Sequence, residues 1–338
     1  METQRRGKST CVFGEMPFIA STASVVGPRE GQGPLGTGFD VVYKDTLAGE
    51  SSWEKSESRM IRQAVDIALA KVSLTDDDVD FLLAGDLLNQ ITASGFMGRD
   101  HDIPFLGLYG ACSTMMEGLG LGGALVAGGF ARKIVATASS HHDTAERQYR
   151  YPSEYGYQRS PTSQWTVTGA GAALVSNEGP GPRIESFTAG RIQDHGIIDP
   201  NDMGSAMAPA FVDTLSRHLQ DMERTPKDYD LILSGDLGRI GSIVTRHLLK
   251  EKGIDVTGVH QDAGLLIYEM TPDICSGASG CGCIATVFAA KVWKEINSGK
   301  LGRVLLVATG ALHSPTTCQQ NESIPSIAHA VSVVGVSN

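Results

Sequence analysis

One segment of the chain occurs twice. Residues 75–87 return 150 positions later as residues 225–237, sharing the pattern Thr-x-x-Asp-x-Asp, four apolar or small residues, and Gly-Asp-Leu. Two weaker echoes follow in the same order: Cys112, Gly128 and Arg132 recur at an offset of 171 as Cys283, Gly299 and Arg303, and residues 135–137 recur at an offset of 172 as residues 307–309. Solenoid repeats are about 20–50 residues long, so this period indicates duplicated half-domains instead. We expect an N-terminal half of residues 1–180 and a C-terminal half of residues 181–338, together forming one compact domain.

The composition indicates a folded protein and argues against several classes. The chain has 338 residues, enough to bury a large core, and 41% of them are hydrophobic. A net charge of −10 argues against nucleic acid as a partner, because such a partner requires a surface that neutralises phosphates. Six scattered cysteines without disulfide-scaffold spacing indicate reduced thiols. No window approaches the roughly 18 apolar residues of a membrane span, so we expect a soluble protein that docks on a membrane through partners.

Strands and helices alternate in both halves. The apolar spacing predicts helices at residues 54–71, 114–128, 205–219 and 284–296 and strands at residues 80–84, 103–108, 132–138, 170–176, 231–233 and 303–309. Residues 1–50 are expected to be irregular. The helix at 114–128 lacks a polar face and is therefore expected to be buried on all sides, with its glycines allowing close approach. This alternation predicts an α/β fold with mostly parallel sheets covered by helices.

Two short motifs connect this duplication with a known superfamily. Gly-Ala-Cys-Ser-Thr at residues 110–114 resembles the nucleophile motif of the thiolase superfamily, and Ser-Gly-Ala-Ser-Gly at residues 276–280 resembles the run that follows the thiolase catalytic histidine. The resemblance implies the thiolase-like five-layered α-β-α-β-α fold, made of two duplicated βαβαβ halves.

Four longer strings, spread over the whole chain, are more specific. Residues 85–90, 144–152, 202–209 and 307–312 resemble the stage V sporulation protein AD family, a thiolase-like family of spore proteins. The resemblance implies a dipicolinic acid (pyridine-2,6-dicarboxylate) binding subunit of the spore membrane channel complex, needed for uptake of this acid during sporulation and linked to its release at germination. It also implies a forespore or spore location, peripheral on the inner spore membrane, with membrane subunits of the same complex as partners and a second copy of the chain as a further one.

The residues expected for thiolase chemistry are only partly present. Cys112 precedes the buried helix, and a helix N-terminus would lower the pKa of its thiol. Ile274 and Cys275 stand near the position of the thiolase histidine, and no histidine follows the strand that ends at Asp236. We therefore expect no enzyme, with no catalytic residues. The alternative is an acyl-transferring condensing enzyme, of the thiolase or β-ketoacyl synthase type, that uses Cys112 and a coenzyme A or carrier-protein thioester. A purely structural scaffold is the third hypothesis.

A ligand site requires hydroxyl and N–H donors, a positive group and an apolar wall for a flat small-molecule dianion. The residues that we expect to supply them are Cys112, Ser113, Thr114, Asp86, Asn89, Arg147 and Tyr151. The last two belong to a basic and aromatic segment, residues 147–159, from which one arginine could clamp a carboxylate. The alternative for that segment is a subunit interface or plain surface. If the ligand is bound as its calcium chelate, Asp86, Asn89 and Asp236, at the carboxyl ends of strands, could hold the ion.

No cofactor or resident metal is expected. The run Gly-x-Gly-x-x-Gly at residues 31–36 matches the dinucleotide fingerprint, but without a clear strand before it and a clear helix after it a glycine turn is the better interpretation. Cys275, Cys281 and Cys283 lack the paired Cys-x-x-Cys spacing of zinc sites and are expected to be buried thiols.

Overall fold

The computed structural model describes residues 3–149 and 159–335, and Tyr151 lies outside them. The first half supplies β3 (Phe18–Val26), β5 (Phe81–Gly85), β6 (Phe105–Gly107), β7 (Lys133–Ser140) and β9 (Gly169–Ser176). The second half supplies β10 (Arg183–Thr188), β11 (Leu231–Gly235), β12 (His260–Asp262), β14 (Arg303–Ala311) and β15 (Ser326–Val334). The strand order is β6-β5-β7-β9-β3 in the first set and β12-β11-β14-β15-β10 in the second, which is the same arrangement twice.

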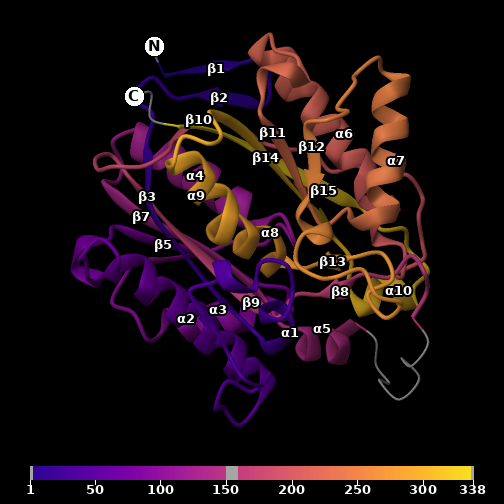
Figure 1. The fold of residues 1–338 in the computed structure, drawn as a ribbon, viewed down its shortest axis with the longest axis horizontal. Helices are drawn as coiled ribbons and strands as arrows, with labels where there is room; N and C mark the ends of the chain where they lie inside the picture. The colour runs from indigo at the N-terminus through magenta and orange to yellow at the C-terminus, as the bar shows by residue number, and fades with distance from the viewer. Residues whose placement is uncertain (1–2, 150–158, 336–338) are drawn as a thin grey trace.

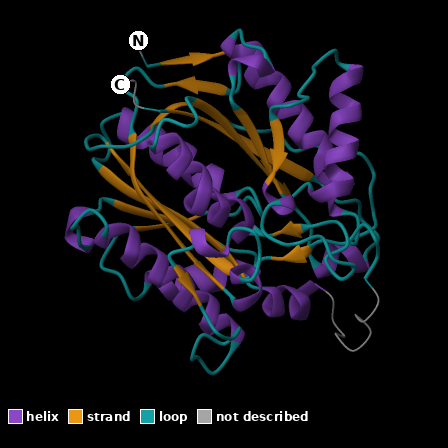
Figure 2. Ribbon diagram, in the orientation of Figure 1, coloured by secondary structure: helices purple, strands orange, loops and turns teal. Residues whose placement is uncertain are grey.

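The helices complete a five-layered α-β-α-β-α arrangement (Figure 1, Figure 2). α2 (Trp53–Ala70) and α3 (Thr92–Gly98) cover the outer face of the first sheet, and α6 (Met203–Met222) and α7 (Gly238–Glu251) cover the second. Between the sheets lie α4 (Thr114–Ala127) and a continuous helical segment of α8 (Cys281–Val287), a π turn (Phe288–Val292) and α9 (Trp293–Asn297). The fold class predicted from the resemblance is therefore confirmed, while nothing in the structure tests the exact division of the chain at residue 180.

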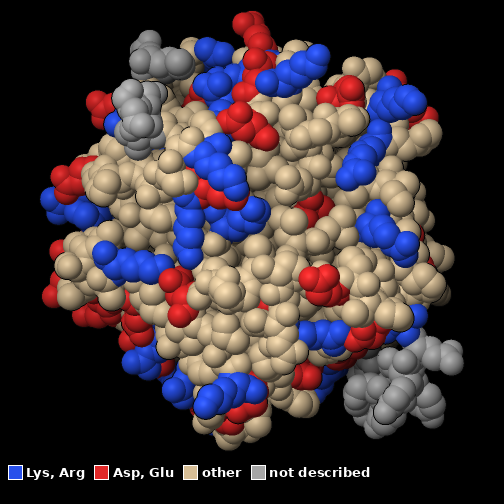
Figure 3. All heavy atoms as spheres, in the orientation of Figure 1, with Lys and Arg blue, Asp and Glu red and all other residues tan. Residues whose placement is uncertain are grey.

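Shorter elements lie around this framework. They are β1 (Gln4–Arg6), β2 (Thr10–Val12), β4 (Val41–Val42), β8 (Trp165–Thr166), β13 (Ala278–Ser279), α1 (Pro28–Gly31), α5 (His142–Tyr149), α10 (Pro315–Gln319) and the 3-10 turns Gly36–Gly38, Asp76–Asp78, Asn89–Ile91, Pro226–Asp228 and Ala263–Leu265. Acidic and basic side chains are interspersed on the face shown in Figure 3.

The duplicated segment makes the same contacts in both halves. Thr75 and Asp78 form a reciprocal capping box, and Thr225 and Asp228 form another. Asp80 accepts hydrogen bonds from the N–H groups of Arg132 and Lys133, just as Asp230 accepts them from Gly302 and Arg303. These contacts relate β7 to β14 by an offset of 170, so the sequence echoes at offsets of 171 and 172 are one and two residues out of register.

The sheets are mixed, so the prediction of mostly parallel sheets is wrong. β5 pairs in parallel with β6 and β7, but β9 is antiparallel to both β7 and β3. The second half repeats this pattern with β11, β14, β15 and β10. Antiparallel neighbours need no crossover helix on the sheet face. The last strand of each half in chain order, β9 or β15, is therefore not predicted correctly from the alternation of strands and helices.

The expectation that residues 1–50 are irregular is also wrong. β3 is a nine-residue strand in the interior of the first sheet, buried from Ser21 to Val26. A strand buried on both faces shows no alternation, and its small polar residues conceal it further. Ser21 Oγ, for example, is buried and donates to the carbonyl oxygen of Ala68 in α2. The glycine turn expected at residues 31–36 is present, although the strand β3 precedes it. Glycine is required at position 33, because a Cβ there would lie 1.9 Å from the carbonyl oxygen of Ile267.

The glycines of α4 bring that helix close to both sheets, as its sequence predicts. The expectation that the helix is buried on all sides is wrong, because Leu121 is 37% exposed. A Cβ on Gly118 would lie 3.3 Å from Ala136 of β7, and one on Gly120 would lie 2.1 Å from the ring of Phe187 of β10. The helix therefore fits between the sheets only because these positions carry no side chain.

We expect Gly120→Ala to lower the free energy of unfolding by about 1–3 kcal/mol, because the Phe187 ring must move in a packed core. Gly95→Ala is the matched control, since a Cβ on the exposed Gly95 of α3 would have nothing within 4 Å of it. Chemical denaturation that gives equal stabilities for the two variants would contradict this view of the packing.

Candidate functional site

Cys112 lies at the centre of the molecule, in the turn between β6 and α4. Its exposed fraction is 7%, and Ala111 before it adopts a left-handed backbone with φ 48°. The carboxyl end of β14 packs against this turn so closely that a Cβ on Gly310 would lie 2.1 Å from the carbonyl oxygen of Gly110. A turn of the first half and a strand of the second half therefore build the surroundings of Cys112 together.

Two further buried thiols belong to α8. The Cys281 thiol donates to the carbonyl oxygen of Ala111 at 2.9 Å, which ties α8 to the Cys112 turn. Cys283 is also fully buried, so the prediction of buried thiols is confirmed for Cys281 and Cys283. It is wrong for Cys275, which is only half-buried. Cys112 stands two residues before α4, however, whereas Cys283 stands inside α8, so the two are not equivalent positions of the repeat.

The electrostatics of Cys112 differ from the expectation. Burial, and secondarily the nearby Asp236, raise the pKa of the Cys112 thiol well above its usual value, and the N–H groups of Gly280 and Cys112 offset this only in part. The predicted lowering of the pKa by a helix N-terminus is therefore wrong, because the loss of solvent outweighs the backbone donors. The thiol is protonated at neutral pH.

Four buried carboxyl groups surround this region. Burial, and then the neighbouring Asp86, raise the pKa of Glu57 to about 8, and burial raises the pKa of Asp262 to about 6. Burial also raises the pKa values of Asp86 and Asp236. Glu57, Asp86 and Asp236 all act on the Cys281 thiol, which shows that the carboxyl groups of both halves converge on the same place.

The predicted ligand residues differ in burial and in their hydrogen-bond partners. The Ser113 hydroxyl donates to the carbonyl oxygen of Gly110 at 2.6 Å and that of Thr114 donates to Ala111 at 2.7 Å, so both hold the turn together. Asp86 is buried, with its carboxylate saturated by Leu88 and Ser94. Asn89 is exposed.

In the basic and aromatic segment, the structure describes residues 147–149 and 159, and their side chains pack against other parts of the protein. Arg147 forms an ion pair with Glu54 and lies over the ring of Trp53 at the start of α2. Arg159 pairs with Glu146 at 2.8 Å and lies over Trp165. These contacts favour the surface interpretation for Arg147, whose side chain is 52% exposed, whereas Arg159 is packed within the protein with a side chain 13% exposed.

Two tyrosines join the site to the surface. Tyr149 donates to the carbonyl oxygen of Leu87 at 2.8 Å, and its ring centroid lies 5.3 Å from that of His313. Tyr109 hydrogen-bonds to Tyr149 and is 46% exposed, while its phenol acts electrostatically on Cys112 and Cys281. Sequence reasoning missed Tyr109, although it directly precedes the Gly-Ala-Cys-Ser-Thr motif.

Four buried or half-buried imidazoles have partners away from Cys112. His141 bonds to the carbonyl oxygen of Thr46, His218 bridges Thr188 and Tyr229, and His260 contacts Ser234. The Nδ1 atom of His313 lies 3.3 Å from the Cys318 sulfur. His141, His218 and His260 are therefore engaged elsewhere, whereas a thiol needs a base beside it to become a nucleophile. His313 packs on Tyr149 and contacts the sulfur of Cys318.

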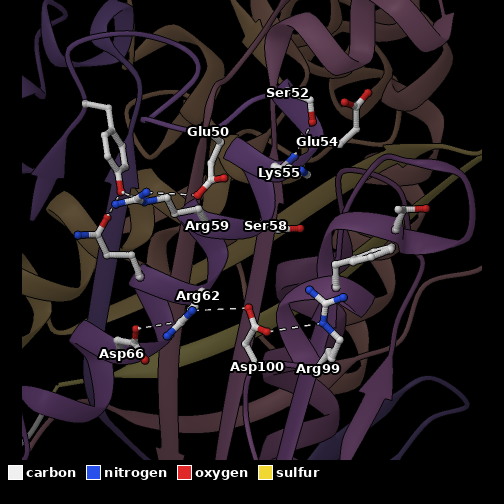
Figure 4. Close-up of a pocket in the computed structure, with 14 residues that line it drawn as sticks. Glu50, Ser52, Glu54, Lys55, Ser58, Arg59, Arg62, Asp66, Arg99 and Asp100 are labelled. Atoms are coloured by element: carbon white, nitrogen blue, oxygen red, sulfur yellow. Dashed lines mark hydrogen bonds and ion pairs between the residues drawn. The ribbon is translucent and has the colours of Figure 1, made fainter.

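A separate groove lies over α2 and α3 on the outer surface (Figure 4). Its arginines are already paired: Arg59 with Glu50, Arg62 with Asp66 and Asp100, and Arg99 with Asp100. The groove is therefore nearly balanced in charge and shares no lining residue with the Cys112 site.

Two features of the described residues bear on membranes and metals. No helix in residues 3–149 and 159–335 is both long and apolar enough to cross a bilayer. Within the same ranges, no group of three or more histidine, cysteine or acidic side chains is arranged to hold a metal ion.

The fold and the central cysteine define a protein of the thiolase-like class. The structure superposes on 3-oxoacyl-[acyl-carrier-protein] synthase III of Aquifex aeolicus with a TM-score of 0.57 and 12% identity, covering 94% of this chain and 99% of that one. It superposes on a cerulenin-bound OleA variant of Xanthomonas campestris with a TM-score of 0.61 and 15% identity, covering 96% and 97%. These identities establish a shared fold alone.

The sequence is more specific. Residues 7–334 match the stage V sporulation protein AD family, to which this chain belongs. It is 50% identical over 325 residues to the stage V sporulation protein AD of Bacillus subtilis, covering 96% of each chain. The chain is thus a sporulation protein with a thiolase-like fold.

The buried carboxyl groups predict a pH dependence of stability. The folded-state pKa of Glu57 is raised from 4.5 to about 8, so the unfolded chain loses this proton first as the pH rises. Folding stability should therefore fall between about pH 4.5 and pH 8, by up to about 1.4 kcal/mol per pH unit from this group. Glu57→Gln removes the titration, and we expect urea denaturation at pH 5 to 8 to show a shallower fall than in the wild type. Parallel curves for the two proteins would refute the assignment.

Proposed function

We propose that the chain is a non-catalytic subunit that binds dipicolinic acid for a spore membrane complex. The observation that carries the proposal is the membership of a sporulation family combined with a buried, protonated Cys112 where a thiolase-like fold places its nucleophile. In this interpretation the central site is retained to bind a small molecule and not to transfer an acyl group.

The state of Cys112 argues against the acyl-transferase alternative. Nucleophilic catalysis requires a thiolate or a base that removes the proton, and burial favours the thiol. The four histidines described above are engaged with Thr46, Tyr229, Ser234 and Cys318. Because the members of a catalytic unit act together, the absence of one costs orders of magnitude in rate.

The charge of the site limits how dipicolinate can be held. A dianion beside ionised carboxylates would be repelled, whereas protonated carboxyl groups and backbone N–H groups can donate to it. The calcium chelate of dipicolinate has no net charge and avoids the repulsion in another way. The proposal therefore includes both forms, and titration with and without calcium separates them.

The remaining parts of the proposal concern location and partners. As a subunit of a membrane complex, the protein would lie on the inner spore membrane, held by membrane subunits of that complex. A second copy is also proposed as a partner. β6 is an edge strand whose Phe105 and Leu106 are 36% and 42% exposed, and such an edge needs protection or a pairing partner.

Calorimetric titration with dipicolinate, with and without calcium, tests the function. We expect saturable binding that Cys112→Trp weakens at least about tenfold by filling the site, while Cys112→Ala retains it because no thiol chemistry is required. Benzene-1,3-dicarboxylate, which lacks the ring nitrogen, is the matched ligand control and should bind more weakly.

A second experiment tests the acyl-transferase alternative. Incubation with acetyl-coenzyme A followed by mass spectrometry would add an acetyl group to wild-type Cys112 but not to Cys112→Ala. Such labelling, or the absence of dipicolinate heat at millimolar ligand, would overturn the proposed function.

A further inference from the structure

Asp86 and Asp236 are equivalent residues of the duplicated segment, but only one of them has a structural role. Both follow the last residue of a strand, β5 or β11, and both are 0% exposed. Asp86 accepts from the N–H of Leu88 at 2.8 Å and from both the N–H and the hydroxyl of Ser94 at 2.8 and 2.7 Å. Its carboxylate therefore closes the loop that follows its own strand.

In the second half, Asp262 of β12 closes the corresponding loop. It accepts from the N–H groups of Leu237 and Gly238 at 3.1 and 2.9 Å and from the hydroxyl of Ser234 at 2.6 Å. The loop after β11 is thus held without the side chain of Asp236. The carboxyl group of Asp236 therefore does not hold the loop after its strand in place, as that of Asp86 does.

Among the described residues, no donor has full hydrogen-bonding geometry to either carboxyl oxygen of Asp236. Its main chain is left-handed, with φ 73°, and its own carbonyl oxygen accepts from Gln164 Nε2 at 2.5 Å. A buried polar group without a partner and a non-glycine residue at positive φ both cost stability. Both costs fall on one residue beside Cys112, which points to a role other than folding.

The titratable side chains that act on Asp236 are acids or thiols. They are Cys112 from the turn before α4, Cys281 and Cys283 from α8, and Asp262 from β12, with the Cys283 thiol and the N–H of Gly280 as neutral donors nearby. None of these side chains becomes positive, so none supplies a counter-charge for a carboxylate. Burial, and then the charge of Asp262, raise the pKa of Asp236 well above its usual value. A buried carboxyl group that faces no cation favours its neutral form, and the O–H of that form is then available to a ligand.

We propose that Asp236 donates its O–H to a carboxylate of the ligand bound beside Cys112. The inference rests on the proposed function and names one contact of its site. A hydrogen bond from a neutral acid to a carboxylate is short and charge-assisted, and it recognises an anion without a lysine or arginine. An ionised Asp236 would instead repel the same ligand.

Calorimetry with dipicolinate at pH 7 on two variants tests the contact. Asp236→Asn keeps a donor of similar size, and we expect its affinity to stay within about threefold of the wild type. Asp236→Ala removes the donor, and we expect binding to weaken about tenfold or more, as for a lost bond to a charged group. Thermal unfolding of each variant establishes that it is folded.

Infrared spectroscopy measures the protonation state of the Asp236 carboxyl group. The wild type should show a carbonyl-stretch component of a protonated carboxyl group that Asp236→Asn lacks, beside the component of Glu57 that both proteins share. The component that belongs to Asp236 should shift when dipicolinate is added. No difference between the two proteins in this region would mean that Asp236 is ionised and would overturn the inference.

The outcomes separate this contact from the function itself. Wild-type binding that Asp236→Ala leaves unchanged, or that Asp236→Asn weakens as much as Asp236→Ala does, overturns the contact alone. Absence of wild-type binding overturns the proposed function and the contact with it. Retained binding by Asp236→Asn with loss by Asp236→Ala supports both.

Discussion

The packing of α4 and α8 between two sheets is the constraint on which the rest of the structure depends. α4 has no polar face, and its glycines allow Ala136 and Phe187 to approach from opposite sides. The starts of both helices are consequently buried in the middle of the molecule. Any polar group placed there loses water on all sides, which explains why Cys112, Glu57, Asp236 and Asp262 hold their protons more tightly than they would in water.

Local patterns predicted much of the fold. The apolar character and the glycines of α4 lie within the helix itself, so the sequence contains the signal that it packs between the sheets. β3 was missed because its environment is supplied by elements far away in the chain, including Ala68 of α2. The antiparallel fifth strands were missed for the same reason, since pairing direction is a tertiary property.

Sequence motifs marked only part of the central region around Cys112. Cys112 and Asp86 were found through the nucleophile motif and the repeat, and both lie in the central region. Glu57, Cys281 and Asp262 come from separate elements and meet only in the folded protein, so spacing could not reveal them. The pKa of Cys112 was predicted in the wrong direction because sequence shows a helix start but not the degree of burial, which decides the sign.

Duplication explains how such a site can arise within one fold. Each copy of the strand–loop unit has an aspartate where the strand ends, and the side chain of Asp86 closes the loop of the first copy. Once Asp262 holds the second loop, the carboxyl group of Asp236 is no longer needed there and can face the centre. The sequence shows two identical Gly-Asp-Leu strings, and only the hydrogen bonds reveal that their aspartates differ. The shared string reflects the duplication, while the difference in hydrogen bonding leaves the carboxyl group of Asp236 facing the centre of the molecule.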